Sequence, residues 1–153
     1  MVVEGCMACD VLRGVLPPPG GIIYEDPYWQ VDHALAPIAL AGWLILKPKR
    51  HCEHLAALTP PELSGLGPLL GNTARALDEA VHPVKIHIHL MAESVKHLHF
   101  YIIPRQANMP ANGLALLQEM FDGRWATDDA AAAAVVVRVR PLLQRLMAET
   151  PTQ

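Results

Sequence analysis

Polar and apolar residues alternate along two neighbouring segments of the chain, residues 84–91 and 96–103. Successive side chains of a strand point to opposite faces, so this pattern predicts two strands with one apolar face each. The connection between them is short, and we therefore expect an antiparallel hairpin. One face of this hairpin would gather polar rings, namely those of His87, His89, His97, His99 and Tyr101.

Apolar residues spaced by three and four predict a helix over residues 58–81. Thr59 and Glu62 have the spacing of a capping box, and the two prolines between them suit a first turn. Pro68 and several glycines lie inside this segment, and they should weaken or kink the helix.

The rest of the pattern predicts a second helix and more strands. The second helix covers residues 127–149, with Thr127 as its expected cap and Pro141 as a kink or an interruption. Residues 22–34 should form two short strands around a turn, and residues 42–48 a buried strand. The order of strands, helix, strands and helix indicates an α+β fold, in which helices pack on an antiparallel sheet.

The composition fits one globular domain that spans residues 1–153. Hydrophobic residues make up 52% of the chain and charged residues 18%, which argues against disorder. The net charge of -3 gives no attraction to nucleic acid or to an anionic membrane, and no apolar segment is long enough for a membrane span. We see no signal peptide, and three cysteines do not suggest a disulfide framework, so a cytoplasmic protein is expected.

The histidines and cysteines suggest specific chemistry. Neutral imidazole is a metal ligand and also a nucleophile or base near pH 7. Cys6 and Cys9 have a CxxC spacing that lets both thiolates bind one zinc ion, and His51 and His97 are candidates for the other two ligands. Reduced cysteines in a turn and a redox pair are the alternatives for CxxC. The alternative for the histidines is a solvated face of the sheet.

The sequence resembles the histidine triad (HIT) superfamily over about residues 6 to 105. "HLHFYIIPR" resembles the family signature of histidines alternating with apolar residues before Pro-Arg. Three other blocks also resemble family segments: "CMACDVLRG", "IIYEDPYWQV" and "GWLILKPKRHCEHLAALTPPEL". Residues 106–153 would form a C-terminal extension that contains a helix.

The resemblance implies a HIT-like fold, a homodimer, and an enzyme that hydrolyses or transfers nucleotidyl groups at the α-phosphate of a nucleotide derivative. It implies that His99 is the nucleophile and forms a covalent nucleotidyl-histidine, with Tyr101 beside it as a hydrogen-bond donor. Substrate contacts are expected from Ser94, His97 and Arg105, although Arg105 could instead form a surface ion pair.

The resemblance also implies a structural zinc ion. Zinc-containing members of the family hold the ion through the CxxC pair, the histidine of "PKRH" and the first histidine of the triad. Those positions are Cys6, Cys9, His51 and His97 in this chain. With four protein ligands, the ion would have no open position for substrate.

Several positions depart from the family pattern. Tyr101 replaces the third histidine and removes a cation, because tyrosine is neutral near pH 7. Glu93 would repel a phosphate unless it is protonated or turned away. Trp43 stands where the family has a histidine, and His33 or Ala34 lies where it has a ribose-binding acid or amide.

Three functions remain open at this point. The first is the nucleotidyl enzyme, with a nucleoside phosphoramidate or a dinucleoside polyphosphate as substrate. The second is a zinc-stabilised nucleotide-binding or scaffold protein with little turnover, which the altered pocket would favour. The third is a different metal chemistry at one all-nitrogen centre, formed by His87, His89, His97 and His99. Sulfur ligands at the metal would favour the first two.

Overall fold

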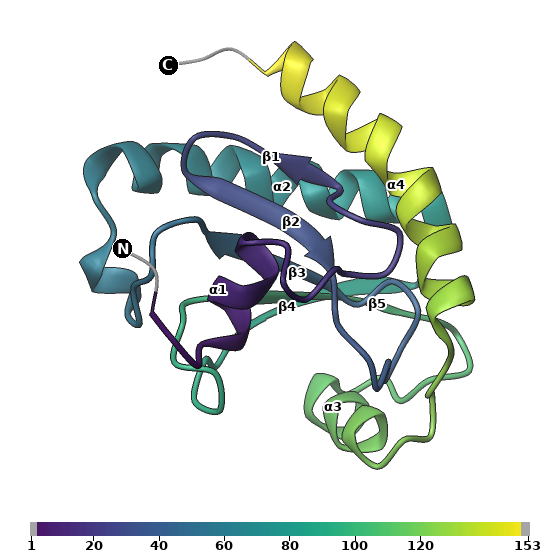
Figure 1. Ribbon diagram of the computed structural model, residues 1–153. Coiled ribbons are helices and arrows are strands. Elements are labelled where there is room, and N and C mark those ends of the chain that lie inside the picture. The colour runs from purple at the N-terminus through teal and green to yellow at the C-terminus, as the bar shows by residue number, and fades with distance from the viewer. Residues whose placement is uncertain (1–2, 151–153) are drawn as a thin grey trace.

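Five strands form a single antiparallel sheet in the computed structural model of the chain, which describes residues 3–150 (Figure 1). Their order across the sheet is β1-β2-β3-β5-β4, so β4 is an edge strand beside β5. The strands are β1 (Tyr24–Glu25), β2 (Trp29–His33), β3 (Leu44–Pro48), β4 (Lys85–Leu90) and β5 (Phe100–Arg105). The α+β class predicted from the sequence is confirmed.

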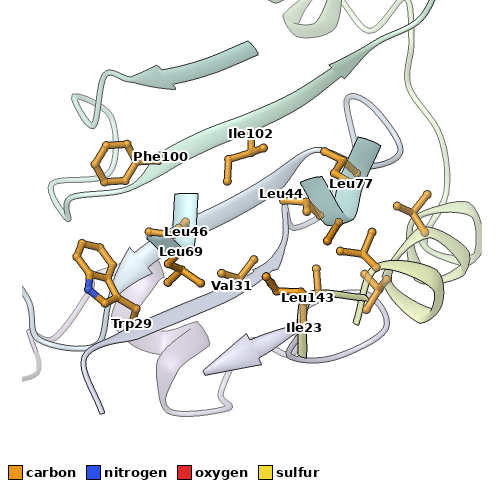
Figure 2. Close-up of a cluster of buried hydrophobic side chains, with 14 of the residues drawn as sticks. Ile23, Trp29, Val31, Leu44, Leu46, Leu69, Leu77, Phe100, Ile102 and Leu143 are labelled. Carbon is orange, nitrogen blue, oxygen red and sulfur yellow. The ribbon is translucent and has the colours of Figure 1, made fainter. Parts of the chain in front are cut away.

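The two long helices, α2 (Pro60–Val81) and α4 (Asp129–Glu149), pack against each other on one face of the sheet (Figure 1). Between them and the strands lies the main apolar core, which Figure 2 shows. Leu69 and Leu77 of α2 are fully buried in it, and truncation of either to alanine would cost about 2–5 kcal/mol. This packing makes the sheet a firm support for its opposite face.

The opposite face carries two short helices, α1 (Met7–Leu12) and α3 (Gly113–Phe121). A second apolar cluster joins Leu116, Leu117 and Met120 of α3 to Trp43 and Ile103. A 3-10 turn, η1 (Leu55–Ala57), precedes α2. Neither α1 nor α3 was predicted from the hydrophobic pattern, because both helices are short.

The first predicted helix is present as α2, and its N-terminus is capped as expected. The backbone N–H of Thr59 donates to the Glu62 carboxylate at 2.7 Å, and the Thr59 hydroxyl donates to the same oxygen at 2.9 Å. Pro68 does not interrupt α2. An interior proline costs about 3 kcal/mol, and burial of the apolar stripe of the helix against the sheet offsets that cost.

The second predicted helix is present as α4, but its expected cap is wrong. The Asp128 side chain accepts a hydrogen bond from the backbone N–H of Ala131 at 2.9 Å, so Asp128 is the cap. Thr127 instead forms an isolated β-bridge with Ile38. Pro141 lies inside α4 without interrupting it. Within residues 3–150, no helix has the length and apolar character of a membrane span.

β4 and β5 form the predicted antiparallel hairpin, with His89 opposite Tyr101. β5 begins at Phe100, later than the predicted strand, so His97 and His99 lie in the segment just before it. The backbone of that segment is held by a hydrogen bond from the Leu98 N–H to the carbonyl of Cys52 at 2.7 Å. The two histidines are therefore fixed in place although they precede the regular strand.

Candidate active site and metal centre

Two cysteines and two histidines meet where α1 approaches the sheet. Cys6 and Cys9 come from the start of α1, His51 follows β3, and His97 precedes β5. Their ligand atoms all lie within 4.8 Å of one another. The structure thus brings together the four positions that the resemblance implied as metal ligands.

The spacing of these atoms fits a zinc ion. Zinc bonds sulfur at about 2.3 Å and imidazole nitrogen at about 2.1 Å, so a sulfur–nitrogen edge of a tetrahedral site is about 3.6 Å long. Cys6 Sγ lies 3.6 Å from His97 Nδ1, and Cys9 Sγ lies 3.5 Å from His51 Nδ1 and 3.7 Å from His97 Nδ1. The donor set and the distances both match a closed tetrahedral site.

The protonation of His97 also suits a metal. Its Nε2 donates a hydrogen bond to the carbonyl of Pro48 at 2.9 Å, which leaves Nδ1 unprotonated toward the sulfurs. Burial lowers the pKa of His97 to about 4, so the ring is neutral at pH 7. Nδ1 thus faces the sulfurs and Nε2 the backbone, and the predicted contact of His97 with substrate stays a prediction.

His99 has the arrangement of a nucleophile. Its Nδ1 donates a hydrogen bond to the backbone carbonyl of His97 at 2.6 Å, and this bond fixes the proton on Nδ1. Within residues 3–150, its ring makes no hydrogen bond other than this one, so the lone pair of Nε2 is free. Burial lowers the pKa of His99 below its ordinary 6.5, and the ring is therefore neutral and nucleophilic near pH 7.

His99 lines a mainly apolar cavity of about 260 Å³ between α1 and the sheet. A few polar groups in an apolar pocket are typical of small-molecule sites. The apolar lining comes from α1, from the loop after β2 and from the strands, and it includes Met7, Ala8, Val11, Leu35, Pro37, Trp43 and Ile45. His99 therefore borders a mainly apolar space that has few polar groups.

Tyr101 lines the same cavity next to His99, with 5.0 Å between the ring centroids. Burial raises the pKa of the Tyr101 phenol above 10.0, so the group is neutral at physiological pH. Trp43 packs edge-on against Tyr101 at 5.0 Å and restrains its ring. The predicted position of Tyr101 on the face of His99 is thus observed.

A buried ion pair between Asp32 of β2 and Lys47 of β3 lines the cavity, and the sequence pattern did not predict it. Gln30 donates to the same Asp32 oxygen at 2.8 Å. Burial lowers the pKa of the Lys47 ammonium, and the neighbouring Asp32 carboxylate opposes that shift. A lysine near the end of an otherwise apolar strand was the signal that could have revealed the pair.

The resemblance places His33 or Ala34 where the family has a ribose contact, but the His33 ring forms hydrogen bonds with the backbone. Nδ1 donates to the carbonyl of Ala34 at 2.9 Å, and Nε2 accepts from the N–H of Gly42 at 2.9 Å. Burial lowers the pKa of His33, so it is neutral. His33 and Ala34 do line the cavity, but the imidazole nitrogens are not available to a ribose hydroxyl.

Ser94 and Glu93 lie outside the cavity of His99. Both are exposed in the connection between β4 and β5. Ser94 lines a separate hollow, which it shares with Cys6 and His51. The expected contact of Ser94 with phosphate stays a prediction, and Glu93 does not line the cavity of His99.

Arg105 lies at the opposite end of β5 from His99. Its guanidinium donates to the carbonyls of Gln106 and Met109 at 3.5 and 3.4 Å. The structure does not bring Arg105 to the cavity, and among the described residues it forms no ion pair. Its substrate contact stays a prediction.

His87 and His89 do not join the other histidines. Their rings stack on β4 with centroids 5.9 Å apart, and the backbone of α3 covers them at Gly113. A metal ion could be held by a cluster of three or more histidine, cysteine or acidic side chains. In the part of the chain that the structure describes, the only such cluster consists of Cys6, Cys9, His51 and His97. The all-nitrogen centre is therefore not formed.

Comparison of the sequence with known proteins identifies the family of this chain. The HIT domain family model matches residues 18–108, and the chain belongs to that family. An uncharacterised HIT-like protein of Methanocaldococcus jannaschii is 26% identical over 108 residues, which are 65% of this chain and 78% of the relative. Members of the family generally act on nucleotides as hydrolases or transferases.

Solved structures of similar fold include two bacterial proteins. A HIT-like protein involved in cell-cycle regulation from Bartonella henselae has a TM-score of 0.71 and 19% identity, and the match covers 93% of this chain and 98% of that one. A zinc-bound histidine triad family protein from Mycobacterium smegmatis has a TM-score of 0.71 and 20% identity, with 95% and 98% coverage. At these identities the likeness establishes the fold.

Proposed function

We propose that this HIT protein is a nucleotidyl hydrolase or transferase that acts at the α-phosphate of a nucleotide derivative. The main support is the free Nε2 of His99 at the wall of an apolar cavity, with its proton held on Nδ1 by a backbone carbonyl. Candidate substrates are nucleoside phosphoramidates and dinucleoside polyphosphates. Membership of the HIT family supports the general class of reaction.

The reaction would proceed in two displacements. His99 Nε2 attacks phosphorus, an N–P bond forms, and the bond to the leaving group breaks. The leaving group keeps the electron pair of that bond and takes a proton from solvent. Water then attacks phosphorus and loses a proton, the N–P bond breaks, and a nucleoside monophosphate and neutral His99 are released. The Tyr101 hydroxyl donates a hydrogen bond to a phosphoryl oxygen, and Ser94 is a further candidate contact.

The same proposal includes a structural zinc ion held by Cys6, Cys9, His51 and His97. The sulfur–nitrogen distances support it, as does the zinc-bound relative of the same fold. When bound, the ion supplies a cross-link between α1 and the two segments that lead to the active site. With four protein ligands it would leave the chemical step to His99.

A second candidate is a zinc-stabilised nucleotide-binding or scaffold protein with little turnover. The observation that favours it is the neutral Tyr101 in place of a third histidine, because it removes a cation from the phosphate site. The exposed position of Ser94 outside the cavity points the same way.

The two candidates are separated by incubating the protein with a panel of nucleoside phosphoramidates and dinucleoside polyphosphates and measuring nucleoside monophosphate. We expect turnover that His99→Ala abolishes and that His54→Ala, at an exposed histidine outside the site, leaves unchanged. Binding of nucleotides without any turnover would favour the second candidate.

We also propose a homodimer formed through β4. The strand has β5 on one side, and its outer edge is unpaired in the described part of the chain. Ile88 and Leu90 on this edge are 43% and 40% exposed, and antiparallel pairing of two such edges would continue the sheet. Light scattering should give a dimer that Ile88→Lys dissociates, whereas Val137→Lys on the exposed face of α4 should not. A monomeric wild-type protein would overturn this proposal.

Reduced Cys6 and Cys9 are needed for the metal site, and they are maintained in the cytoplasm. We therefore propose a cytoplasmic location. Fractionation of cells that express the tagged protein would test it, since recovery with a secreted or membrane fraction would contradict it.

A further inference from the structure

The Asp32–Lys47 pair is an unusual feature of the cavity wall. The two side chains are only 3% and 2% exposed, and the residues around them in the cavity are mainly apolar. Removing two charges from water costs more than their attraction commonly returns, so such a pair is weak support for stability. Buried charges of this kind cluster at functional sites, and this pair borders the cavity of the nucleophile.

The pair has hydrogen-bonding capacity that the protein does not use. Lys47 has three N–H donors, and within residues 3–150 it donates to Asp32 alone. Asp32 accepts from Lys47 and Gln30 through Oδ2, while its Oδ1 has no partner in the same part of the chain. Since both residues line the cavity, these free groups can bond to a molecule inside it.

Lys47 lies on the face of the sheet that borders the cavity of His99. Ile45 lies opposite Tyr101 and Leu46 opposite Phe100, where the pairing of β3 with β5 ends. Lys47 is two residues from Ile45 on β3, so it shares the face of Ile45 and Tyr101, and it lines the same cavity as His99. An ammonium group on this face is therefore within reach of a phosphoryl group held at His99.

We propose that Lys47 contacts a non-bridging oxygen of the phosphoryl group bound at His99, and thereby supplies the cationic donor that Tyr101 cannot. Asp32 is a positioning residue: it holds the ammonium in place and favours its charged form against the apolar wall. The pair is neutral overall, so it would recognise phosphate through directed N–H bonds rather than through surplus charge. This inference rests on the proposed function, because it requires a phosphoryl group at His99.

Calorimetric titration with the four ribonucleoside 5′-monophosphates and the matching nucleosides tests the proposal. For the monophosphate that binds best, Lys47→Met should weaken binding about tenfold or more, while affinity for the matching nucleoside changes less than twofold. The control is Lys49→Met, which breaks an exposed ion pair with Glu25 near the same strand and outside the cavity. It should change neither affinity.

Two further variants separate a contact from a structural role. Asp32→Asn should weaken monophosphate binding in the same selective way and add nothing in the Lys47→Met background, because it acts through Lys47. If Lys47→Met does not fold, the double variant Asp32→Leu, Lys47→Met replaces the pair by apolar side chains of similar size. The same selective loss is expected from it.

The outcomes distinguish this inference from the function on which it rests. An equal loss for monophosphate and nucleoside would make the pair structural and overturn the inference, and so would an unchanged monophosphate affinity or no binding by the wild type. Turnover that is the same in Lys47→Met and wild type would leave the proposed function intact and remove the inference. A selective loss of binding in a protein without turnover would retain the phosphate contact and reject the enzyme.

Discussion

Removal of the metal ligands is expected to destabilise the protein and to release α1 from the sheet. The perturbation is the double variant Cys6→Ser, Cys9→Ser, which removes both sulfur ligands and preserves side-chain size. The site connects parts of the chain that lie 42 and 91 residues apart. α1 has six residues, too few to be stable in isolation, so it depends on this connection.

The size of the effect follows from ligand linkage. An ion present at 100 to 1,000 times its Kd stabilises the folded state by about 2.7 to 4.1 kcal/mol. For a chain of this length each kcal/mol corresponds to about 2–4 °C in Tm, so the loss should be about 5–16 °C. Without the zinc ion, the link between α1 and the buried His97 would be lost. Amide hydrogen exchange should therefore increase first in residues 6–12.

The assay is metal analysis of protein purified without chelator, followed by thermal denaturation of each variant. We expect one zinc per chain in the wild type and none in the double variant. Cys52→Ser is the matched control, since Cys52 is a buried thiol outside the metal group. Zinc at full occupancy in the double variant, or a wild type without zinc, would refute the ligand assignment.

Two other substitutions have calculable effects. Tyr101→Phe should slow single turnover by about two- to tenfold, because one neutral hydrogen bond contributes about 0.5–1.5 kcal/mol. Tyr101→His would restore the third histidine and should raise the rate. A Tyr101→Phe variant as inactive as His99→Ala would make Tyr101, and not His99, the principal catalytic group. Hydrogen bonds from Arg50 lower the pKa of Glu62 from 4.5 to about 2, although burial opposes this shift. A depressed carboxylate pKa stabilises the fold above pH 4.5, and this stabilisation is lost as the pH falls through 2. The pKa difference corresponds to about 3 kcal/mol, and solvent at the half-exposed Arg50 reduces this to about 1–2 kcal/mol. Glu62→Gln should therefore destabilise the protein by that amount at pH 7 in urea denaturation and by much less near pH 2; an equal loss at both pH values would contradict the pKa assignment.

The long periodic elements were predictable because their patterns are local. The alternation around His87 and His89 is visible in a few residues, as is the capping box of Thr59 and Glu62, and both are confirmed. α3 was missed although Asn112, its N-cap, precedes an apolar run. Its nine residues give a weak periodic signal in any single window.

The site was predictable where it depends on motif positions and not where it depends on tertiary contacts. The resemblance located Cys6, Cys9, His51 and His97, and the fold brings them together. No local pattern reveals that the His33 ring is used by the Gly42 N–H, since that contact needs the loop between β2 and β3. The position of Arg105 away from the cavity likewise follows from the length of β5.

The most direct test of a nucleotidyl enzyme is to trap its covalent intermediate. The protein would be mixed with a nucleoside phosphoramidate, quenched at alkaline pH to preserve the N–P bond, and examined by intact mass and by peptide fragmentation. We predict an added nucleotidyl group on the peptide that contains His99, absent from His99→Ala and present in His54→Ala. Turnover by His99→Ala at the wild-type rate, or a nucleotidyl group on any other residue, would contradict the account.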